Sequence, residues 1–127
     1  MLNYFNLSLS KADTRQKNKA FKNLKARYQD YSDPWGFNLD AVKVAMNTVL
    51  PLYRNYFKVR VFGIENVEDK PYMMVSNHTG QVPIDAVLTT LAFAYEFEKP
   101  RVVHTMIERF MAGLPFVGDF TAQTGSI

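Results

Sequence analysis

Cysteine is absent from this 127-residue sequence, and histidine occurs only twice, at His78 and His104. The absence of cysteine excludes disulfides, thiolate metal sites and a cysteine nucleophile. Two histidines are too few for a histidine-rich metal site, so we expect no metal. No uncharged run reaches the roughly 18 residues that a membrane-spanning helix needs, and the first ten residues do not resemble a secretory signal. We therefore expect a cytoplasmic protein that is soluble or peripheral to a membrane.

Several well-known catalytic and cofactor-binding motifs are also missing. The sequence has no Gly-x-Ser-x-Gly nucleophile elbow, no Gly-x4-Gly-Lys-Ser/Thr phosphate loop, no Gly-x-Gly-x-x-Gly dinucleotide turn and no His-Glu-x-x-His metal helix. It contains no recognised nucleic-acid-binding motif either. These absences leave reactions that need no enzyme nucleophile and no tightly bound cofactor, and we expect no nucleic-acid partner.

The residues that are present indicate a folded chain. Apolar residues make up 47% and aromatic residues 14% of the sequence, which is too apolar for a disordered chain. A length of 127 residues allows one domain at most, large enough for a core but short for a complete enzyme.

Positive charge is concentrated near the start of the chain. Residues 11–30 hold seven Lys or Arg and two Asp, a local charge of +5, whereas the whole chain carries +3. Ser10 and Asp13 form a capping-box pattern that opens a helix to about Gln29. We treat residues 1–32 as a basic amphipathic segment. It could lie on an anionic membrane surface, pack against its own domain, or present only a solvated basic face.

The rest of the chain alternates between apolar runs of strand length and helical patterns. Asp33 to Gly36 is a turn signal, and a helix from Leu39 should kink or break near Leu50 because Pro51 follows. Further helices are predicted from Asp85 to Phe97 and over 108–112, with an apolar loop over 113–118. Strands are predicted over 58–62, 72–75, 101–104 and 121–127. This alternation predicts an α/β fold in which helices pack on a mixed, mostly parallel sheet.

The most informative stretch is residues 72–85. A short apolar run ends at Ser76, and His78 and Gly80 follow before Pro83 and Asp85 open a helix. Glycine can take the positive φ of a sharp turn, and proline suits the first turn of a helix. An imidazole oriented by a carboxylate is a competent general base. The alternative is that Asp85 is only a helix N-terminal acid and His78 an ordinary loop histidine.

No nucleophile accompanies this pair. Ser76 and Thr79 lie next to His78, but neither stands in a known nucleophile context. A histidine base without a nucleophile suits a reaction in which the base activates a hydroxyl of the substrate itself. His104, at the end of a predicted strand, is either a second site histidine or a structural residue, and we favour the structural role.

Residues 76–85, Ser-Asn-His-Thr-Gly-Gln-Val-Pro-Ile-Asp, resemble the first motif of the glycerolipid and lysophospholipid acyltransferase family. The commonest form of that motif is Asn-His-x4-Asp. Six residues separate His78 from Asp85 here, as in a branch that reads Asn-His-Ser-Gly-x-x-Pro-x-Asp. The Asp-Pro-Trp-Gly turn at 33–36, the stretch 56–66, and the Leu-Pro-Phe-Val-Gly at 114–118 are similar to further pieces of that branch.

The resemblance implies transfer of a fatty acyl group from acyl-CoA or acyl-carrier protein to a hydroxyl of a glycerol phosphate or lysophospholipid, with no other cofactor. His78 would be the general base and Asp85 its partner, while Asn77, Gly80 and Pro83 of the motif would lie against substrate. A protein that acts on membrane lipids is expected to be peripheral to the inner face of the membrane, and the basic segment at residues 11–30 is expected to contact its anionic surface.

One family motif has no counterpart in the sequence. The later Glu-Gly-x-Arg, which holds the acceptor phosphate, is absent. We therefore interpret residues 33–127 as the N-terminal half of an acyltransferase domain, an incomplete domain that should show little transfer alone and self-associate through an unpaired strand near Ile127. The alternative is a non-catalytic lipid- or partner-binding α/β fragment that retains a remnant of the His–Asp motif.

Overall fold

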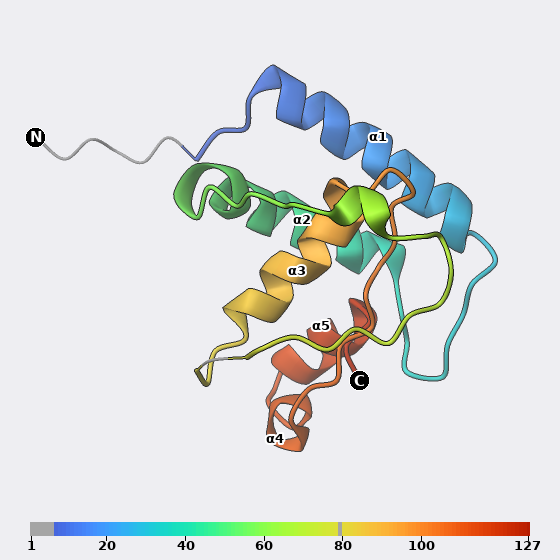
Figure 1. Cartoon of the computed structure of the whole chain (residues 1–127). Helices are drawn as coiled ribbons and strands as arrows, with labels where there is room; N and C mark the ends of the chain where they lie inside the picture. The colour runs from blue at the N-terminus through green and yellow to red at the C-terminus, as the bar shows by residue number, and fades with distance from the viewer. Residues whose placement is uncertain (1–6, 79) are drawn as a thin grey trace, which may run out of the picture.

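The computed structural model describes residues 7–78 and 80–127. These residues form helices joined by extended or irregular segments (Figure 1). The helices are α1 (Lys11–Tyr28), α2 (Leu39–Pro51), the π-helix η1 (Leu52–Tyr56), the 3-10 helix η2 (Ile64–Asn66), α3 (Ile84–Tyr95), α4 (Arg109–Ala112) and α5 (Val117–Gln123).

Helix α1 begins where the capping pattern predicts. The Ser10 hydroxyl oxygen accepts a hydrogen bond from the backbone N–H of Asp13 at 3.0 Å and donates to the Asp13 carboxylate at 2.6 Å. This satisfies one of the N–H groups that every helix start leaves without an intrahelical partner. The predicted helix over residues 10–29 is confirmed.

Helix α2 changes its winding at Pro51. Asn38 caps its start by accepting from the N–H of Asp40 at 2.7 Å. Proline has no N–H to continue the α-helical ladder, and the chain goes on as a π-helix, in which Phe57 donates its N–H to the carbonyl of Leu52 at 2.8 Å. The helix predicted from Leu39 is confirmed, and the break predicted near Leu50 takes the form of this transition.

Helices α1, α2 and α3 share one hydrophobic core. Three large side chains, Leu24, Leu50 and Tyr53, are fully buried within it. Burying a leucine or comparable side chain contributes roughly 1.5–3 kcal/mol each. The buried core residues are Ala20, Leu24, Val42, Met46, Leu50, Tyr53, Leu91, Ala92, Ala94, Tyr95 and Val102. Helix α3 therefore has a fixed position, which matters because Asp85 lies in its first turn.

The predicted sheet is wrong. The part of the chain that the structure describes contains no strand, and its β pairing is limited to one isolated parallel bridge between Thr105 and Ser126. A strand needs a neighbouring chain about 4.8 Å away to satisfy its backbone groups. Apolar alternation predicts an extended backbone but does not supply that neighbour. An α/β fold with a mixed, mostly parallel sheet therefore does not describe this structure.

The segments predicted as strands nevertheless lie outside the helices. Residues 58–62, 72–75 and 101–104 are irregular, and 72–78 are exposed throughout. Phe62, Met73 and Val75 expose 83%, 86% and 87% of their surfaces. These three side chains therefore do not contact the helical core, whereas Val59, Val61 and Val102 of the same segments do.

The end of the chain also differs from the prediction. Residues 117–123 form α5, whereas a strand was predicted over 121–127. Local hydrogen bonds satisfy this backbone, such as that from the N–H of Phe120 to the carbonyl of Phe116. Gly118 permits the close packing of α5 on α4, because an added Cβ would lie 2.1 Å from the Ala112 carbonyl oxygen. The short helix predicted over 108–112 is confirmed as α4.

Candidate functional site

His78 and Asp85 form a direct side-chain pair on the surface. The Nδ1 atom of His78 lies 2.9 Å from Oδ2 and 3.0 Å from Oδ1 of Asp85. An ionised carboxylate only accepts hydrogen bonds, so Nδ1 is the donor in this pair. The unprotonated nitrogen of a neutral His78 is then Nε2, to which no residue in the described ranges hydrogen-bonds.

The loop between the two residues brings them together despite their separation of seven positions. Gly80 has φ +94°, a conformation that side chains with a Cβ rarely adopt. Pro83 precedes α3 as its N-cap residue and provides no side-chain cap. The chain thus turns at Gly80 and returns along Pro83, so that the first turn of α3 faces His78. Thr79 lies outside the described residues.

Asp85 is held by its own helix as well as by the histidine. Its Oδ1 accepts a hydrogen bond from the N–H of Ala86 at 2.9 Å, and the hydroxyl of Thr89 donates to its backbone carbonyl at 2.8 Å. A carboxylate in the first turn is also favoured by the helix dipole. The side chains of His78 and Asp85 are 52% and 39% exposed, so a substrate can approach the pair from solvent.

The remaining predicted site residues lie near the pair in sequence but do not enclose it. Asn77, Gly80 and the apolar residues Met73 and Val75 are exposed. Two pockets of about 500 and 400 Å³ lie elsewhere, the first between residues 64–69 and 96–99, the second between α1 and residues 95–100. Neither pocket includes His78 or Asp85. The His–Asp pair is therefore an open surface site.

A polar network that the sequence did not predict holds α3 in place. Tyr53 donates its hydroxyl to Glu96 at 2.8 Å, and Tyr95 donates to Asp13 at 2.9 Å, joining η1, α3 and α1. Arg54 adds an ion pair with Asp13 at 2.9 Å. Burial raises the pKa of both tyrosines well above the usual range. A buried tyrosine needs a partner for its hydroxyl, so tyrosines within an apolar stripe were the available signal.

His104 packs among aromatic rings. Its ring centroid lies 5.9 Å from that of Tyr31 and 5.8 Å from that of Phe37, and its Nε2 is 3.5 Å from the Tyr31 hydroxyl. The neighbouring turn at residues 33–36 forms as predicted. Asp33 Oδ1 accepts from the N–H groups of Trp35, Gly36 and Phe37 at 2.9–3.0 Å. The ring of His104 is therefore packed against the side chains of Tyr31 and Phe37.

Within 7–78 and 80–127, no three His, Cys, Asp or Glu side chains are grouped so that they could hold a metal ion. In the same residues, no helix combines the length and apolar character that crossing a membrane requires.

Similar sequences come from mycobacteria. The chain is 27% identical over 99 residues to the uncharacterized protein Mb0514 of Mycobacterium bovis, which covers 76% of this chain and 28% of the relative. It is 28% identical over 99 residues to the uncharacterized protein ML2427 of Mycobacterium leprae, covering 76% and 27% of the two chains. The chain thus spans less than a third of the length of these relatives.

No solved structure matches the chain. Residues 58–127 match the sequence profile of the family described as Acyltransferase. This range contains the whole His78–Asp85 loop and α3, whereas the resemblance noted in the sequence started earlier, at Asp33. Because the match covers more than half of the sequence, the chain belongs to the acyltransferase family.

Proposed function

We propose that this chain serves the transfer of a fatty acyl group from acyl-CoA or acyl-carrier protein to a hydroxyl of a glycerol phosphate or lysophospholipid. Membership of the acyltransferase family supports acyl transfer in general. The observation that carries the finer proposal is the contact between His78 Nδ1 and the Asp85 carboxylate at 2.9 Å. We assign it to the cytoplasmic side of a membrane, where glycerolipid acceptors and thioester donors meet.

The chemistry follows from the tautomer that Asp85 favours. With Nδ1–H donated to the carboxylate, Nε2 of His78 takes the proton of the acceptor hydroxyl as its oxygen attacks the thioester carbonyl carbon. The carbonyl π electrons move to oxygen and then return, breaking the C–S bond. The departing thiolate takes the proton back from Nε2. Asp85 stabilises the transient imidazolium, and no enzyme nucleophile takes part.

The loop residues have supporting roles in this proposal. Asn77 is exposed beside His78 and offers an amide donor to the substrate. Gly80 presents no Cβ, and nothing lies within 4 Å of the position a Cβ would take, so a substrate could approach the backbone there. Pro83 fixes the approach to α3, which positions Asp85.

The test measures thiol release from palmitoyl-CoA with glycerol 3-phosphate or a lysophosphatidate as acceptor. The absence of cysteine removes any background reaction of the protein with a thiol reagent. The chain lacks the family's phosphate-binding Glu-Gly-x-Arg, so we expect slow turnover by itself. The assay is therefore repeated in a chimera in which residues 58–127 replace the matching segment of an active family member.

His78→Ala and Asp85→Asn should each lower turnover by about 10²- to 10⁴-fold, the range for loss of general-base catalysis. His104→Ala is the matched control, because it removes the other histidine, and it should retain turnover within a few-fold. Near-normal turnover by the His78→Ala protein would rule out the general-base role. If the chain and a folded chimera bind palmitoyl-CoA without releasing thiol, the non-catalytic lipid-binding alternative is supported.

A further inference from the structure

The outward face of α1 carries a single row of positive charge. Its members follow one another at intervals of three or four residues, which places them on one side of a helix. With a rise of 1.5 Å per residue, the row is about 21 Å long. We call it the basic stripe, and it consists of Lys11, Arg15, Lys19, Lys22 and Lys25.

The basic stripe is unneutralised within the described ranges. All five side chains belong to exposed residues, and none of them forms an ion pair or hydrogen bond there. The other two cations of α1 are engaged: Lys17 donates to Asn47 at 2.7 Å, and Arg27 pairs with Asp69 at 2.8 Å. The helix's own carboxylate, Asp13, is bound to Arg54 and Tyr95. The stripe therefore carries charge of one sign, and two of its members, Arg15 and Lys19, also line the pocket that contains Glu96 and Glu98.

This arrangement does not stabilise α1. Like charges three or four residues apart repel one another along a helix, and Lys11 lies at the helix start, where the dipole disfavours a cation. Helix stability instead comes from the opposite face, where Ala20 and Leu24 are buried. A contact with an anionic partner would explain why the outward face carries these charges.

The side chains of α1 indicate which kind of anionic partner could contact the basic stripe. The apolar face of α1, including Phe21 and Tyr28, packs on its own domain and is not available for insertion into a bilayer. No large hydrophobic residue of α1 is exposed, so the stripe lacks the aromatic or apolar anchors on which protein interfaces depend. Four of its five cations are lysines, flexible point charges that suit a diffuse field better than bidentate recognition of bases or carboxylates.

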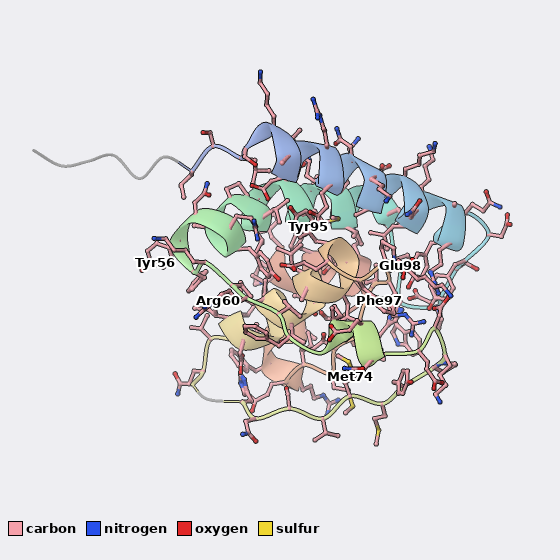
Figure 2. The ribbon with its side chains drawn as sticks, turned by 45° about the horizontal axis from the view of Figure 1, so that its top comes forward. Tyr56, Arg60, Met74, Tyr95, Phe97 and Glu98 are labelled. Carbon is pink, nitrogen blue, oxygen red and sulfur yellow. The ribbon has the colours of Figure 1, made fainter. Side chains whose placement is uncertain are left out.

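The stripe and the His–Asp loop lie on opposite sides of the molecule. In Figure 1, α1 runs along one edge, α3 lies in the middle, and the yellow-green segment that leads to His78 lies along the other edge with α4 and α5. Figure 2 shows the same separation in a tilted view, with nitrogen-tipped side chains projecting outward from α1 and Met74 labelled at the far edge. A surface that contacts α1 therefore leaves the His78–Asp85 pair uncovered.

We propose that the basic stripe adsorbs to an anionic phospholipid membrane by charge alone, without insertion, and that the His–Asp side then faces away from the bilayer. This proposal is independent of the acyl-transfer proposal, since adsorption requires neither His78 nor Asp85. Where both hold, the acceptor reaches His78 from the aqueous side. That geometry favours acceptors that leave the bilayer readily, namely glycerol phosphate or a single-chain lysophospholipid.

Binding is measured by co-sedimentation with vesicles of phosphatidylcholine, with and without phosphatidylglycerol. We expect binding only to the anionic vesicles, and its loss near 1 M salt, where the screening length falls to about 3 Å. Replacing Lys11, Lys22 and Lys25 by Gln should weaken binding by about 100-fold, from the usual contribution of each lysine near an anionic surface. The control, Arg60, Lys99 and Arg109 to Gln, removes equal charge elsewhere and should change binding by only a few-fold.

Orientation is tested with single cysteines, which the cysteine-free sequence makes unambiguous. A dye on Asn18→Cys, within the stripe, should be quenched by a quencher on the lipid headgroup, whereas a dye on Val75→Cys should not. Quenching at position 75 alone, or salt-resistant binding to both vesicle types, would overturn the proposal in favour of the apolar side. Binding to polyglutamate or duplex DNA as tight as to anionic vesicles would overturn it in favour of an acidic protein or a nucleic acid.

Discussion

Tyr95 donates its hydroxyl to Asp13 across 82 positions of sequence, and this 2.9 Å bond joins the end of α3 to the first turn of α1. The same carboxylate accepts a hydrogen bond from the Ser10 hydroxyl and forms an ion pair with Arg54. Tyr53 packs against Tyr95 with ring centroids 6.2 Å apart and bonds to Glu96 in turn. The helix that carries Asp85 is thus held at its far end by a partly buried polar network as well as by apolar packing.

Tyr95→Phe should lower the free energy of unfolding by about 1 kcal/mol, because it removes one hydrogen bond and leaves the ring packing intact. Tyr95→Ala should cost about 3–5 kcal/mol, since it also opens a cavity in the core. Urea unfolding at neutral pH measures both changes. Equal losses in the two variants would show that the hydroxyl, and not the packed ring, dominates at this position.

Stability should fall in acid through Asp33. Its bonds from the N–H groups of Phe37, Trp35 and Gly36 lower its pKa below the ordinary value of 3.8. A lowered folded pKa contributes stability that is present above the unfolded pKa and is lost as pH falls through the folded pKa. Asp33→Asn keeps the accepting oxygen but cannot titrate. Urea unfolding at about pH 7 and about pH 3 should therefore show a smaller acid loss in this variant.

The loss of stability in acid should also depend on a second carboxylate, that of Asp69. The bond from Arg27, followed by that from Arg101, lowers the pKa of Asp69 in the same direction. Asp69→Asn should likewise reduce the acid loss, although it weakens the two arginine contacts at neutral pH. An acid loss in the double variant equal to that of the unmodified chain would contradict both assignments.

Gly80 should be required by the His–Asp loop for its backbone conformation. Its φ of +94° is strained for alanine, at a cost of about 1–3 kcal/mol, although a methyl group would meet no neighbour. Gly80→Ala should therefore lower thiol release in the acyl-transfer assay, with little change in helix content by circular dichroism. Gly80→Asn should recover part of the activity, because asparagine tolerates positive φ better. Full activity of the alanine variant would show that the loop does not need this turn.

Self-association should depend on the exposed extended segment over residues 72–75. Met73 and Val75 are almost fully exposed, and segments of this kind readily pair with another chain. Changing both residues to Lys should reduce dimers and larger species in sedimentation velocity. Asn18→Lys with Gln29→Lys adds the same charge on α1 and at its C-cap and should have a smaller effect. An equal effect of the two pairs would indicate general charge repulsion.

The sequence predicts self-association through an unpaired strand near Ile127, but the backbone there is paired within the chain. The Ile127 N–H donates to the Thr105 carbonyl at 2.8 Å, and the Ile127 carbonyl accepts from the Ile107 N–H at 2.9 Å. The backbone of residues 125–127 is thus already hydrogen-bonded to residues 105–107. Residues 72–78 are the better candidate, because their backbone forms no hydrogen bond to another part of the described chain.

Local sequence alone determined helices α1 to α4 and the turn at residues 33–36, but not α5. Ser10 and Asp13, the helical spacing of Leu24 with its neighbours, and Asp33 ahead of Gly36 each act through contacts within a few residues. The approach of His78 to Asp85 was also foreseeable, because a glycine and a proline over seven positions restrict the loop that joins them. Such features follow from backbone conformation and hydrogen bonds that require no distant partner.

Tertiary structure decided the rest. Residues 58–62, 72–75 and 101–104 have the apolar patterns of strands, yet a strand exists only where another chain segment lies alongside to share its hydrogen bonds. The fate of α1 was likewise open, since its amphipathic pattern fits both a bilayer and a protein core. Helix α1 packs its apolar face against α2 and α3. The basic stripe lies away from that face and therefore remains exposed to solvent.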